Sequence, residues 1–346
     1  MNQSLTKLSD MAQSALYPLR FRPIFKSALW GGRRIARILP DAPAEGPIAE
    51  AWLVSDVDNN LSVVTDGPLA GTTLRGLMQT RNAELGLPHH DRFPLLIKII
   101  DAAQPLSVQV HPNDEQAQAL EGQPRGKTEA WYILHAEPGA KVYAGFKPGV
   151  DRATFLSEFH AGRIENTLHS FEPKAGECIY LPAGTVHAAG AGLTIFEVQQ
   201  TSDITYRLHD WGRVDAKTGK PRELHIEKAI ECLDFGIGPV VAQIENCQRV
   251  EVRDDQTGNA GAAETTGDLV PLCRYFALHR NLAADPGYFE VGGGRLIIAR
   301  SGEAILESTE TGYQSHLGPG TVLLIPAGEY MLRPNGMFES FVSYSR

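Results

Sequence analysis

The chain has 346 residues, and 42% of them are hydrophobic, so it can form a sizeable core in one large domain or in two to three small ones. Its formal net charge of −9 argues against non-specific nucleic-acid binding, which needs a basic surface, although a locally basic pocket could still hold an anionic substrate. No apolar run approaches the roughly 20 residues of a membrane span, and residues 1–16 lack the apolar core of a signal peptide. We expect reduced cysteines and a cytoplasmic protein.

The first hundred residues predict short strands around one helix. Leucine and methionine recur at nearly 3.6-residue spacing over residues 73–86, which predicts a helix there. The nearly continuous apolar run over residues 94–100 is typical of a buried strand. Lys98 lies inside this run, so its charge needs an ionic partner or an anionic ligand. We expect further short strands over residues 19–25, 51–56 and 61–65.

Polar residues alternate with valine between Ser107 and His111. On a strand, this alternation places Ser107, Gln109 and His111 on one face. A Gln and a His two residues apart can both bind one metal ion, and Glu129, on a second segment, could add a carboxylate. Imidazole and carboxylate ligands suit zinc. Taken alone, a Gln-x-His pair is more often part of a polar sheet face or of a pocket wall.

Two later stretches strengthen the metal hypothesis. In residues 178–188, an apolar strand meets a Pro-Ala-Gly turn, and a second strand begins with His187. Residues 197–211 crowd acids, amides and Arg207 into one segment. Elsewhere in this half, we expect helices over residues 113–121, 151–160 and 224–233 and strands over residues 130–135 and 141–146.

The C-terminal third predicts only strands and repeats an earlier pattern. Residues 173–187 match residues 317–331, including the Pro-Ala-Gly turn. We therefore predict a mainly β fold of two related cupin-type jelly-roll barrels with flanking helices, and a helical insertion at about residues 147–170 in the first barrel. The predicted domains are a metal-binding catalytic domain over residues 1–235 and a metal-free domain over residues 240–346.

The second copy lacks the residues that suggest a metal site in the first. Met331 replaces His187, and Gly292 falls near the position of Glu129. We therefore expect the second barrel to bind no metal. Residues 254–268 are rich in Gly, Ala, Thr and acids, which predicts a mobile loop.

Short motifs follow one another in order between roughly residues 17 and 235. They are Trp30–Gly32, Glu50–Ser55, Gly67–Gly71, Pro94–Lys98, Leu106–Pro112, Lys127–Glu129, Leu181–His187 and Gln199–Arg207. In this order they resemble the type I mannose-6-phosphate isomerases, in their shorter bacterial form. Several ordered motifs are far more specific than any one of them.

The resemblance implies one zinc ion per chain, bound by Gln109, His111, Glu129 and His187. With a single carboxylate among its ligands, the ion would keep a net positive charge and polarise substrate oxygens. Fe²⁺ or Mn²⁺ would also suit two histidines and a carboxylate. The implied reaction is the interconversion of mannose 6-phosphate and fructose 6-phosphate through an enediol or enediolate, with a sugar phosphate as the substrate.

The same resemblance suggests which other residues carry the chemistry. Arg207 would stabilise the negative charge that develops on a substrate oxygen, because its own charge does not titrate near neutral pH. Lys127 would move a proton or stabilise an oxygen. Glu197 and Asp203 are both candidates for the base that takes the C2 proton and for ring opening, and the sequence does not rank them.

Lys98 and Ser107 are candidates to hold the substrate or its phosphate. The alternative for the cations Lys98, Lys127 and Arg207 is ion pairing with nearby acids. The glycines of Gly292–Gly294 lack the strand and helix that flank a phosphate loop, and they are typical of a hairpin turn.

Two other functions remain open from the residues. Another cupin metalloenzyme, such as an iron dioxygenase, would use a redox-active metal with open coordination positions. Lys127 and Arg207 instead favour an anionic, non-redox substrate. In a non-catalytic sugar-binding cupin the ligand set or Arg207 would be absent, and both are present. We expect neither a nucleic-acid partner nor a membrane, and either a monomer or a homodimer.

Overall fold

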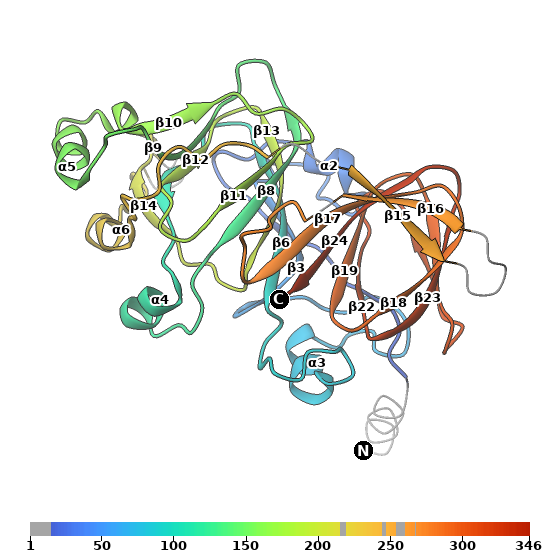
Figure 1. Cartoon of the computed structure of the whole chain (residues 1–346). Coiled ribbons are helices and arrows are strands. Elements are labelled where there is room, and N and C mark those ends of the chain that lie inside the picture. The colour runs from blue at the N-terminus through green and yellow to red at the C-terminus, as the bar shows by residue number, and fades with distance from the viewer. Residues whose placement is uncertain (1–14, 215–218, 244–246, 254–259, 267) are drawn as a thin grey trace. The chain divides into compact units, whose positions relative to one another are not determined.

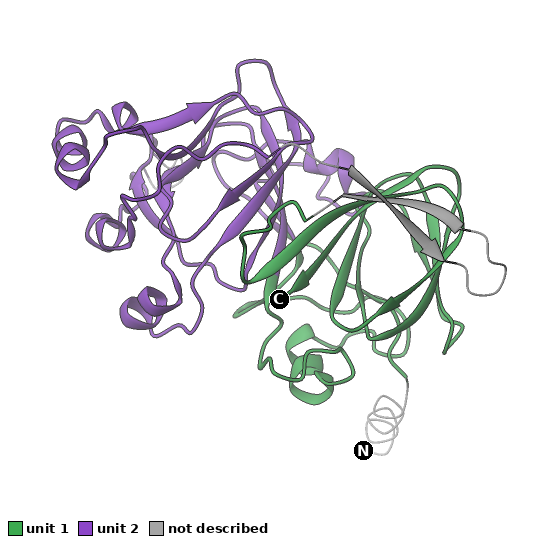
Figure 2. Ribbon diagram, viewed as in Figure 1, with its two compact units in different colours: residues 1–24, 53–95, 246–346 green, residues 25–52, 96–245 purple. Residues whose placement is uncertain are grey.

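The computed structural model describes residues 15–214, 219–243, 247–253, 260–266 and 268–346, which form a mainly β fold, as predicted. By its internal contacts the chain divides into two compact units (Figure 2). Unit 1 takes its described residues from 1–24, 53–95 and 246–346, and unit 2 takes them from 25–52 and 96–245. Most of the segment 1–16, which lacks the apolar core of a signal peptide, lies outside the described residues.

Unit 2 is built from two antiparallel sheets (Figure 1). The five-stranded sheet has the order β10 (Leu168–Phe171), β9 (Val142–Phe146), β12 (His187–Ala189), β7 (Val108–Val110) and β14 (Tyr206–His209). The six-stranded sheet has the order β11 (Cys178–Leu181), β8 (Glu129–Ala136), β13 (Leu193–Gln200), β6 (Leu95–Ala102), β3 (Glu50–Val54) and β2 (Ile24–Lys26).

The core of unit 2 lies between these two sheets. Val142 and Ala189 from the five-stranded sheet belong to the same buried cluster as Trp131, Ile179 and Ile195 from the six-stranded sheet. Side chains two residues apart on a strand share a face, so residues that alternate with these core residues on the same strands also point between the sheets. This geometry places Glu129, two residues before Trp131, and His187, two before Ala189, in the interior.

Helices cover the other face of the five-stranded sheet. Phe155 of α5 (Arg152–His160) and Ala229 of α6 (Ile226–Cys232) pack in one buried cluster with Val108 and Val110 of β7. The sheet that carries Gln109 and His187 is therefore packed against apolar residues on both faces, which fixes its position between two layers. The remaining helices are α2 (Ile35–Ile38), α3 (Leu74–Arg81), α4 (Asp114–Glu121) and the 3₁₀ turn η1 (Ile164–Asn166).

Local sequence signals fix the ends of the helices. Asn113 and Gln116 form the predicted capping box of α4, and Gly122 ends that helix in the left-handed conformation with φ of 63°. Asp151 caps α5 through the backbone N–H of Thr154. The helices predicted over residues 73–86 and 224–233 are present but shorter, as α3 and α6.

Unit 1 contains two further antiparallel sheets. The seven-stranded sheet has the order β1 (Leu19–Arg20), β22 (Val322–Ile325), β19 (Arg295–Ser301), β24 (Phe338–Ser345), β17 (Phe276–Ala283), β16 (Ala260–Thr266) and β15 (Cys247–Arg253). The four-stranded sheet has the order β18 (Gly287–Val291), β23 (Gly328–Pro334), β20 (Ala304–Ser308) and β21 (Gln314–Leu317). A two-stranded hairpin joins β4 (Asp56–Val57) to β5 (Asn60–Leu61).

The strand orders of the two units repeat one another, which supports the predicted duplication. The order β11–β8–β13–β6 in unit 2 corresponds to β22–β19–β24–β17 in unit 1. The order β10–β9–β12–β7 corresponds to β21–β20–β23–β18. In unit 2 the chain between β9 and β10 forms α5 and η1, whereas the loop between β20 and β21 contains no helix. The helical insertion therefore lies within the predicted residues 147–170.

The register corrects one predicted correspondence. Glu129 pairs with Leu181, the residue before the Pro-Ala-Gly turn of unit 2. Ile325 precedes the same turn in unit 1, and it pairs with Arg295. Arg295, and not Gly292, therefore stands at the position of Glu129, because the connections between this strand and the Pro-Ala-Gly turn differ in length between the two copies also outside the helical insertion.

Two other predictions differ from the structure. Residues 260–266, which we predicted as part of a mobile loop, form the strand β16, and residues 254–259 and 267 lie outside the described part. The single strand predicted over residues 19–25 is two separate strands, β1 and β2. Pro23 lies between them, and proline cannot donate to a strand ladder.

The division into compact units also differs from the predicted boundary at residues 235–240. Leu19 of β1 pairs with Leu324 of β22, so an N-terminal strand completes the sheet that the C-terminal residues build. Gly86 and Gly293 are in such close contact that a Cβ on Gly86 would lie 2.2 Å from the Cα of Gly293. Residues 53–95 therefore group with the C-terminal part by contacts that hydrophobic periodicity does not reveal.

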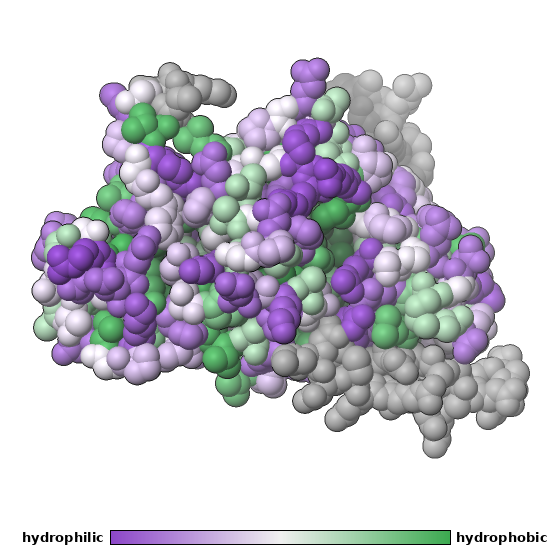
Figure 3. All heavy atoms as spheres, turned by 90° about the horizontal axis from the view of Figure 1, so that it is seen from above, coloured by the Kyte–Doolittle hydropathy of each residue, from purple (hydrophilic) through white to green (hydrophobic). Residues whose placement is uncertain are grey.

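On the face shown in Figure 3, hydrophilic and hydrophobic side chains are interspersed. Cys178, Cys232 and Cys273 are buried and form no disulfide within the described part of the chain. Among the described residues, no helix combines the length and the apolar character that crossing a bilayer requires.

Candidate metal centre and active site

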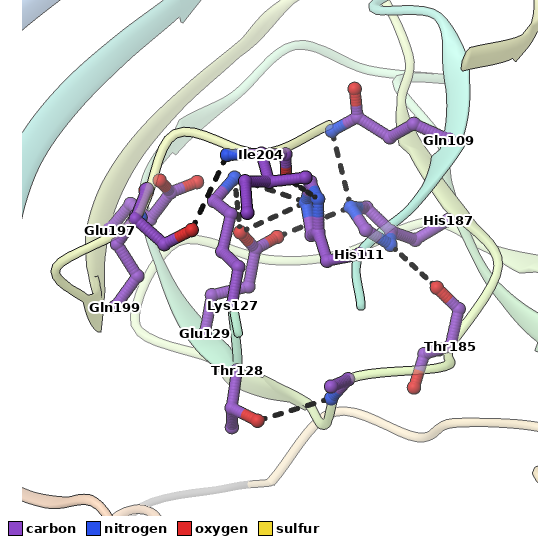
Figure 4. A network of polar contacts seen from close by, with 12 residues as sticks. Gln109, His111, Lys127, Thr128, Glu129, Thr185, His187, Glu197, Gln199 and Ile204 are labelled. Carbon is purple, nitrogen blue, oxygen red and sulfur yellow. Dashed lines mark hydrogen bonds and ion pairs between the residues drawn. The ribbon is translucent and has the colours of Figure 1, made fainter. Parts of the chain in front are cut away.

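Three strands of unit 2 bring the predicted metal ligands together. Gln109 of β7 pairs directly with His187 of β12 in the five-stranded sheet, and Glu129 begins β8 in the facing sheet. His111 follows β7 directly. One ligand atom each from His111, Glu129 and His187 lies within 4.8 Å of the others, and all three residues are buried. Residues that are far apart in the sequence thus converge on one point (Figure 4).

Both imidazoles are held in the orientation that a metal ligand requires. The Nδ1 atom of His111 lies 2.9 Å from the carbonyl oxygen of Ile204, and Nδ1 of His187 lies 2.9 Å from the carbonyl oxygen of Thr185. A carbonyl oxygen only accepts, so each Nδ1 carries the proton and each Nε2 presents a lone pair to the centre. Burial, followed by the nearby ammonium of Lys127, lowers the pKa of His111 to about 3, which keeps its ring neutral.

Glu129 is the carboxylate at the centre of this group. It is fully buried, and neither of its oxygens accepts a hydrogen bond from the described residues. Its Oε1 lies 3.2 Å from Nε2 of His187, and its Oε2 lies 3.4 Å from Nε2 of His111. Burial by itself raises the pKa of Glu129, but Lys127 and His111 together hold this pKa well below its usual value. The group is therefore an ionised carboxylate whose charge is offset by Lys127 but whose oxygens accept no well-directed hydrogen bond from the described residues.

A buried carboxylate facing two imidazole lone pairs fits a divalent cation. Desolvating a carboxylate costs several kcal/mol unless a cation or hydrogen bonds compensate it. Two neutral imidazoles and one carboxylate form a ligand set that zinc accepts. The amide of Gln109 adds a fourth group, because its Nε2 lies 3.2 Å from Nε2 of His187, and turning the amide about its last torsion places Oε1 there. His111, Glu129 and His187 therefore fit one ion, and Gln109 lies next to one of these three residues.

Lys127 places an ammonium beside this centre. Its Nζ lies 2.9 Å from Oε2 of Glu129 and 3.0 Å from Nε2 of His111. The backbone N–H of Lys127 donates to the carbonyl oxygen of Pro112, which ties the segment before β8 to the end of β7. The side chain is 95% buried, so its charge acts in a region of low dielectric.

A cavity of about 300 Å³ opens next to the metal candidates. This volume lies at the lower end of the range of small-molecule sites. The residues at its wall include Gln109 and Lys127, which contact the other three predicted ligands. Predicted site residues supply much of the remaining lining, namely Lys98, Ser107, Glu197, Asp203 and Arg207.

Lys98 and Glu197 form a buried ion pair on one side of the cavity. Nζ of Lys98 lies 3.3 Å from Oε1 of Glu197 and 3.8 Å from Oε2 of Glu50. The indole N–H of Trp131 donates to Oε2 of Glu197 over 2.8 Å. Burial and the nearby Glu129 raise the pKa of Glu197, although Lys98 opposes them. Burial lowers the pKa of Lys98, but Glu197 and Glu50 raise it more, so this lysine is charged.

Arginines gather on another side of the cavity. Arg207 of β14 pairs with Gln109 on the neighbouring strand, which places its side chain beside the metal candidates. Its Nε is buried without a hydrogen-bond partner among the described residues, while its Nη1 donates to the carbonyl oxygen of Glu223 over 2.7 Å. Desolvation, followed by the charge of Arg222, lowers the pKa of Arg207.

Arg222 also lines the cavity and is held in place by Asp210. Its Nε donates to Oδ2 of Asp210 over 2.8 Å, and its Nη2 donates to Oδ1. Arg213 donates to the same Oδ1 atom. The edge of the Arg222 guanidinium that carries Nε and Nη2 is thus fixed on Asp210. Its Nη1 is directed away from Asp210.

The structure separates the two candidate acids. Glu197 is 2% exposed and in contact with Trp131, whereas Asp203 is exposed at the cavity wall. Ser107 is buried and its hydroxyl donates to Oε1 of Gln109 over 3.3 Å. Every residue of the predicted site therefore lies in the cavity lining or in contact with residues that line it.

Sequence reasoning missed Trp131, Glu50 and Arg222. Trp131 follows Glu129 by two residues on one strand, so the same alternation that selected Glu129 indicates that it points inward. Glu50 lies in a quoted motif, but its pairing with Lys98 depends on the contact between β3 and β6. Nothing in the sequence marks Arg222, because it follows a turn whose path only the folded chain defines.

Comparisons with known proteins agree with this geometry. The family described as phosphomannose isomerase type I, catalytic domain, matches residues 19–132. The mannose-6-phosphate isomerase ManA of Bacillus subtilis is 36% identical over 328 residues, covering 94% of this chain and 98% of that protein. The probable mannose-6-phosphate isomerase GmuF of the same organism is 32% identical over 95% of this chain and 99% of its own length.

A solved structure shares the whole fold. The crystal structure of the mannose 6-phosphate isomerase from Bacillus subtilis superposes with a TM-score of 0.82 at 26% identity, covering 95% of this chain and all of that one. The family match includes Gln109, His111 and Glu129, and the sequence relatives extend over His187 and Arg207. The chain therefore belongs to the family of type I phosphomannose isomerases.

Proposed function

We propose that this protein interconverts mannose 6-phosphate and fructose 6-phosphate, with one zinc ion held by Gln109, His111, Glu129 and His187. The observation that carries the proposal is the fully buried Glu129 carboxylate, which accepts no hydrogen bond among the described residues and faces two imidazole lone pairs beside a cavity lined with cations. We further propose that the protein acts in the cytoplasm as a monomer or a homodimer.

The chemistry requires a proton to move between C1 and C2 while negative charge develops on O1 or O2 of the open-chain sugar. A bound zinc ion would supply Lewis-acid polarisation of a substrate oxygen. The side chains of this protein would bind the sugar, keep its reactive carbons next to the proton-transferring groups, and stabilise the developing charge.

We assign the transfer of the C2 proton to Glu197. Its raised pKa suits a group that both takes and returns a proton near neutral pH, which a carboxylate with an ordinary pKa does poorly. The indole N–H of Trp131 fixes one oxygen of Glu197, and the other lies toward Lys98. Asp203, exposed at the cavity wall, is the better candidate for ring opening, because that step also exchanges protons with water.

We assign the remaining roles in the reaction to Arg207, Lys127 and Lys98, together with Ser107. Arg207 would stabilise negative charge on a substrate oxygen, because its buried Nε lacks a partner among the described residues. Lys127 would move a proton to or from the second oxygen, since its ammonium touches the centre. Lys98 and Ser107 would contact the sugar hydroxyls and hold Glu197 and Gln109 in place.

We propose Arg222 as the group that binds the phosphate. Two carboxylates offset the charge of Lys98, and Glu129 offsets the charge of Lys127. Neither lysine therefore offers an uncompensated positive charge to the phosphate dianion. Arg213 and Arg222 instead share the buried Asp210, and Arg207 lies near them, which leaves this side of the cavity net positive. A guanidinium whose one edge is fixed on a carboxylate presents the rest of its donors in a set direction, which suits phosphate oxygens.

The proposal is tested by a coupled assay for fructose 6-phosphate formed from mannose 6-phosphate, before and after chelation. We expect isomerisation by the protein as purified, loss of activity after complete metal removal, and recovery when about one zinc ion per chain is restored. Metal analysis of each sample gives the ion and its stoichiometry. Full activity in metal-free protein would reject the metal assignment, and no isomerisation by zinc-loaded protein would reject the reaction.

Replacing Arg222 with Gln should raise the KM for mannose 6-phosphate about 10- to 100-fold, as expected for losing charge-assisted hydrogen bonds of about 1.5–3 kcal/mol. The change in kcat should be much smaller, because the phosphate does not react and its binding is shared by ground state and transition state. Steady-state kinetics measures both constants.

Arg163→Gln is the matched control for the loss of one positive charge in the same unit, because Arg163 pairs with Glu158 on the helical insertion. It should keep the wild-type KM. If Arg222→Gln instead lowered kcat and left KM unchanged, Arg222 would act on the chemistry and not on the phosphate. Inhibition by inorganic phosphate gives a second readout, which should weaken in Arg222→Gln and not in Arg163→Gln.

A further inference from the structure

Unit 1 contains a cavity of its own, of about 190 Å³. Strands of both its sheets contribute to the wall, so the cavity lies in the interior of this barrel. Most of the wall is apolar, and the polar groups are Asn281, Ser340 and Arg295 with Asp285 at the exposed edge. The apolar part includes Phe289, Val291, Ile297, Phe338 and Val342.

This cavity is the counterpart of the active-site cavity in the duplicated fold. Tyr288 pairs with Met331 as Gln109 pairs with His187, and Arg295 pairs with Ile325 as Glu129 pairs with Leu181. Tyr288, Met331 and Arg295 therefore occupy the positions of three metal ligands, and both Tyr288 and Arg295 line the cavity. Both units therefore contain a cavity at the corresponding place, but different side chains line it.

The register extends the correspondence to the proposed proton-transfer group. Glu197 pairs with Trp131, two residues after Glu129, and Val342 pairs with Ile297, two residues after Arg295. Val342 thus stands at the position of Glu197. The second cavity therefore replaces the metal ligands and the reactive carboxylate by an apolar wall with a single guanidinium.

The exchange of Glu129 for Arg295 reverses the charge at the centre of the site. Within the described part of the chain, the contact found for Arg295 is with the ring of Tyr344, whose centroid lies 5.1 Å from the guanidinium carbon, and no carboxylate pairs with it. Its side chain is half-buried. The Oδ1 atom of Asn281 is also buried without a hydrogen-bond partner among the described residues. A site with an unpaired guanidinium favours an anion over a metal cation.

We propose that this cavity binds a small organic carboxylate with an apolar body of about the size of a benzene ring. Arg295 would bind the carboxylate with two donors, because the guanidinium geometry matches that of a carboxylate. The apolar wall of the cavity would contact the apolar part of the ligand. An apolar cavity of about 150 Å³ in another protein binds benzene. This site is independent of the isomerase reaction, which unit 2 carries out with its own residues.

Benzoate is the probe, and the full zinc-loaded chain is titrated with it. Methyl NMR signals of Ile297 and Val342 report binding in this cavity, which separates it from binding at the arginines of the active site. We expect these signals to shift and saturate at millimolar benzoate or below. Benzyl alcohol, which has the same ring but no charge, should bind about 10-fold more weakly or worse, because it cannot form the charged contact with Arg295.

Arg295→Gln should weaken benzoate binding about 10-fold or more. Arg333→Gln, which removes a charge from an exposed arginine of the same unit that pairs with Glu307, should leave it unchanged. Arg295→Lys, which keeps the charge but not the two-donor geometry, should lie between these two variants and guards against a folding defect in Arg295→Gln. Isomerase turnover and zinc content should match the wild type in all three.

Each alternative outcome overturns the proposal. If the Ile297 and Val342 signals do not shift at millimolar benzoate, the cavity is not a carboxylate site. Equal affinities of wild type and Arg295→Gln would mean that the guanidinium does not bind the ligand. Equal affinities for benzoate and benzyl alcohol would reduce the site to an apolar cavity without charge recognition.

Discussion

Replacing His187 with alanine is expected to remove most of the bound metal and to lower turnover at least about 100-fold. The imidazole contributes one of two neutral nitrogen ligands, and its Nε2 lies 3.2 Å from the Glu129 carboxylate. Changing even the outer partners of metal ligands typically costs 10- to 100-fold in metal affinity, and loss of a direct ligand should cost more. Metal analysis of the dialysed variant gives the result without any activity measurement.

The thermal transition provides a further readout. Metal that binds only the folded protein raises its stability in proportion to the logarithm of metal concentration over Kd. Chelation should therefore lower the Tm of the wild type, while the Tm of His187→Ala should respond little. The control is His135→Ala, which removes an exposed histidine from the strand that carries Glu129, and it should keep wild-type metal content. One zinc ion per chain retained in His187→Ala after dialysis would remove His187 from the ligand set.

Part of the candidate metal site was predictable from short-range rules, and the resemblance to the family supplied the complete ligand set. Alternation along one strand placed Gln109 and His111 on a common face, and the Pro-Ala-Gly turn placed His187 at the start of a strand. The repeat of that turn before Met331 predicted two related barrels. The matching strand orders of the two units support that prediction, because they repeat both the sheets and the place of the helical insertion.

Contacts between distant strands were not predictable in the same way. The sequence left the partners of Lys98 open, and the pairing of β3 with β6 and of β6 with β13 places Glu50 and Glu197 beside it. The same holds for the grouping of residues 53–95 with the C-terminal barrel. Hydrophobic periodicity reports which face of a strand is buried, but it does not report which strand lies opposite.

Burial is what distinguishes the two acids that the sequence left unranked. Glu197 and Asp203 are six residues apart, and both belong to the motif-rich segment before Arg207. Glu197 lies at the centre of β13, which is buried throughout, whereas Asp203 lies in the exposed turn after that strand. Desolvation raises the pKa of a carboxyl group, so the position within the fold, and not the residue type, is the reason we propose Glu197 for the proton transfer.

Glu197→Gln should therefore reduce turnover by about 10²- to 10⁴-fold, the usual contribution of a general base. Gln has almost the same shape and can still accept the indole N–H of Trp131, so KM and zinc content should change little. Proton transfer can be measured directly when mannose 6-phosphate is isomerised in deuterated water. Deuterium incorporation into sugar during turnover should fall together with the rate, because the same carboxylate exchanges its proton with solvent.

Glu50→Gln is the matched control for this experiment, because it removes the other carboxylate that faces Lys98. If the loss in Glu197→Gln arose only from leaving Lys98 with a single partner, Glu50→Gln would show a loss of similar size. We expect instead that Glu50→Gln retains turnover within about 10-fold of the wild type, the scale of a partly exposed ion pair. If deuterium incorporation were unchanged in Glu197→Gln, another group would transfer the proton. In that case Asp203→Asn is the variant that should lose deuterium incorporation.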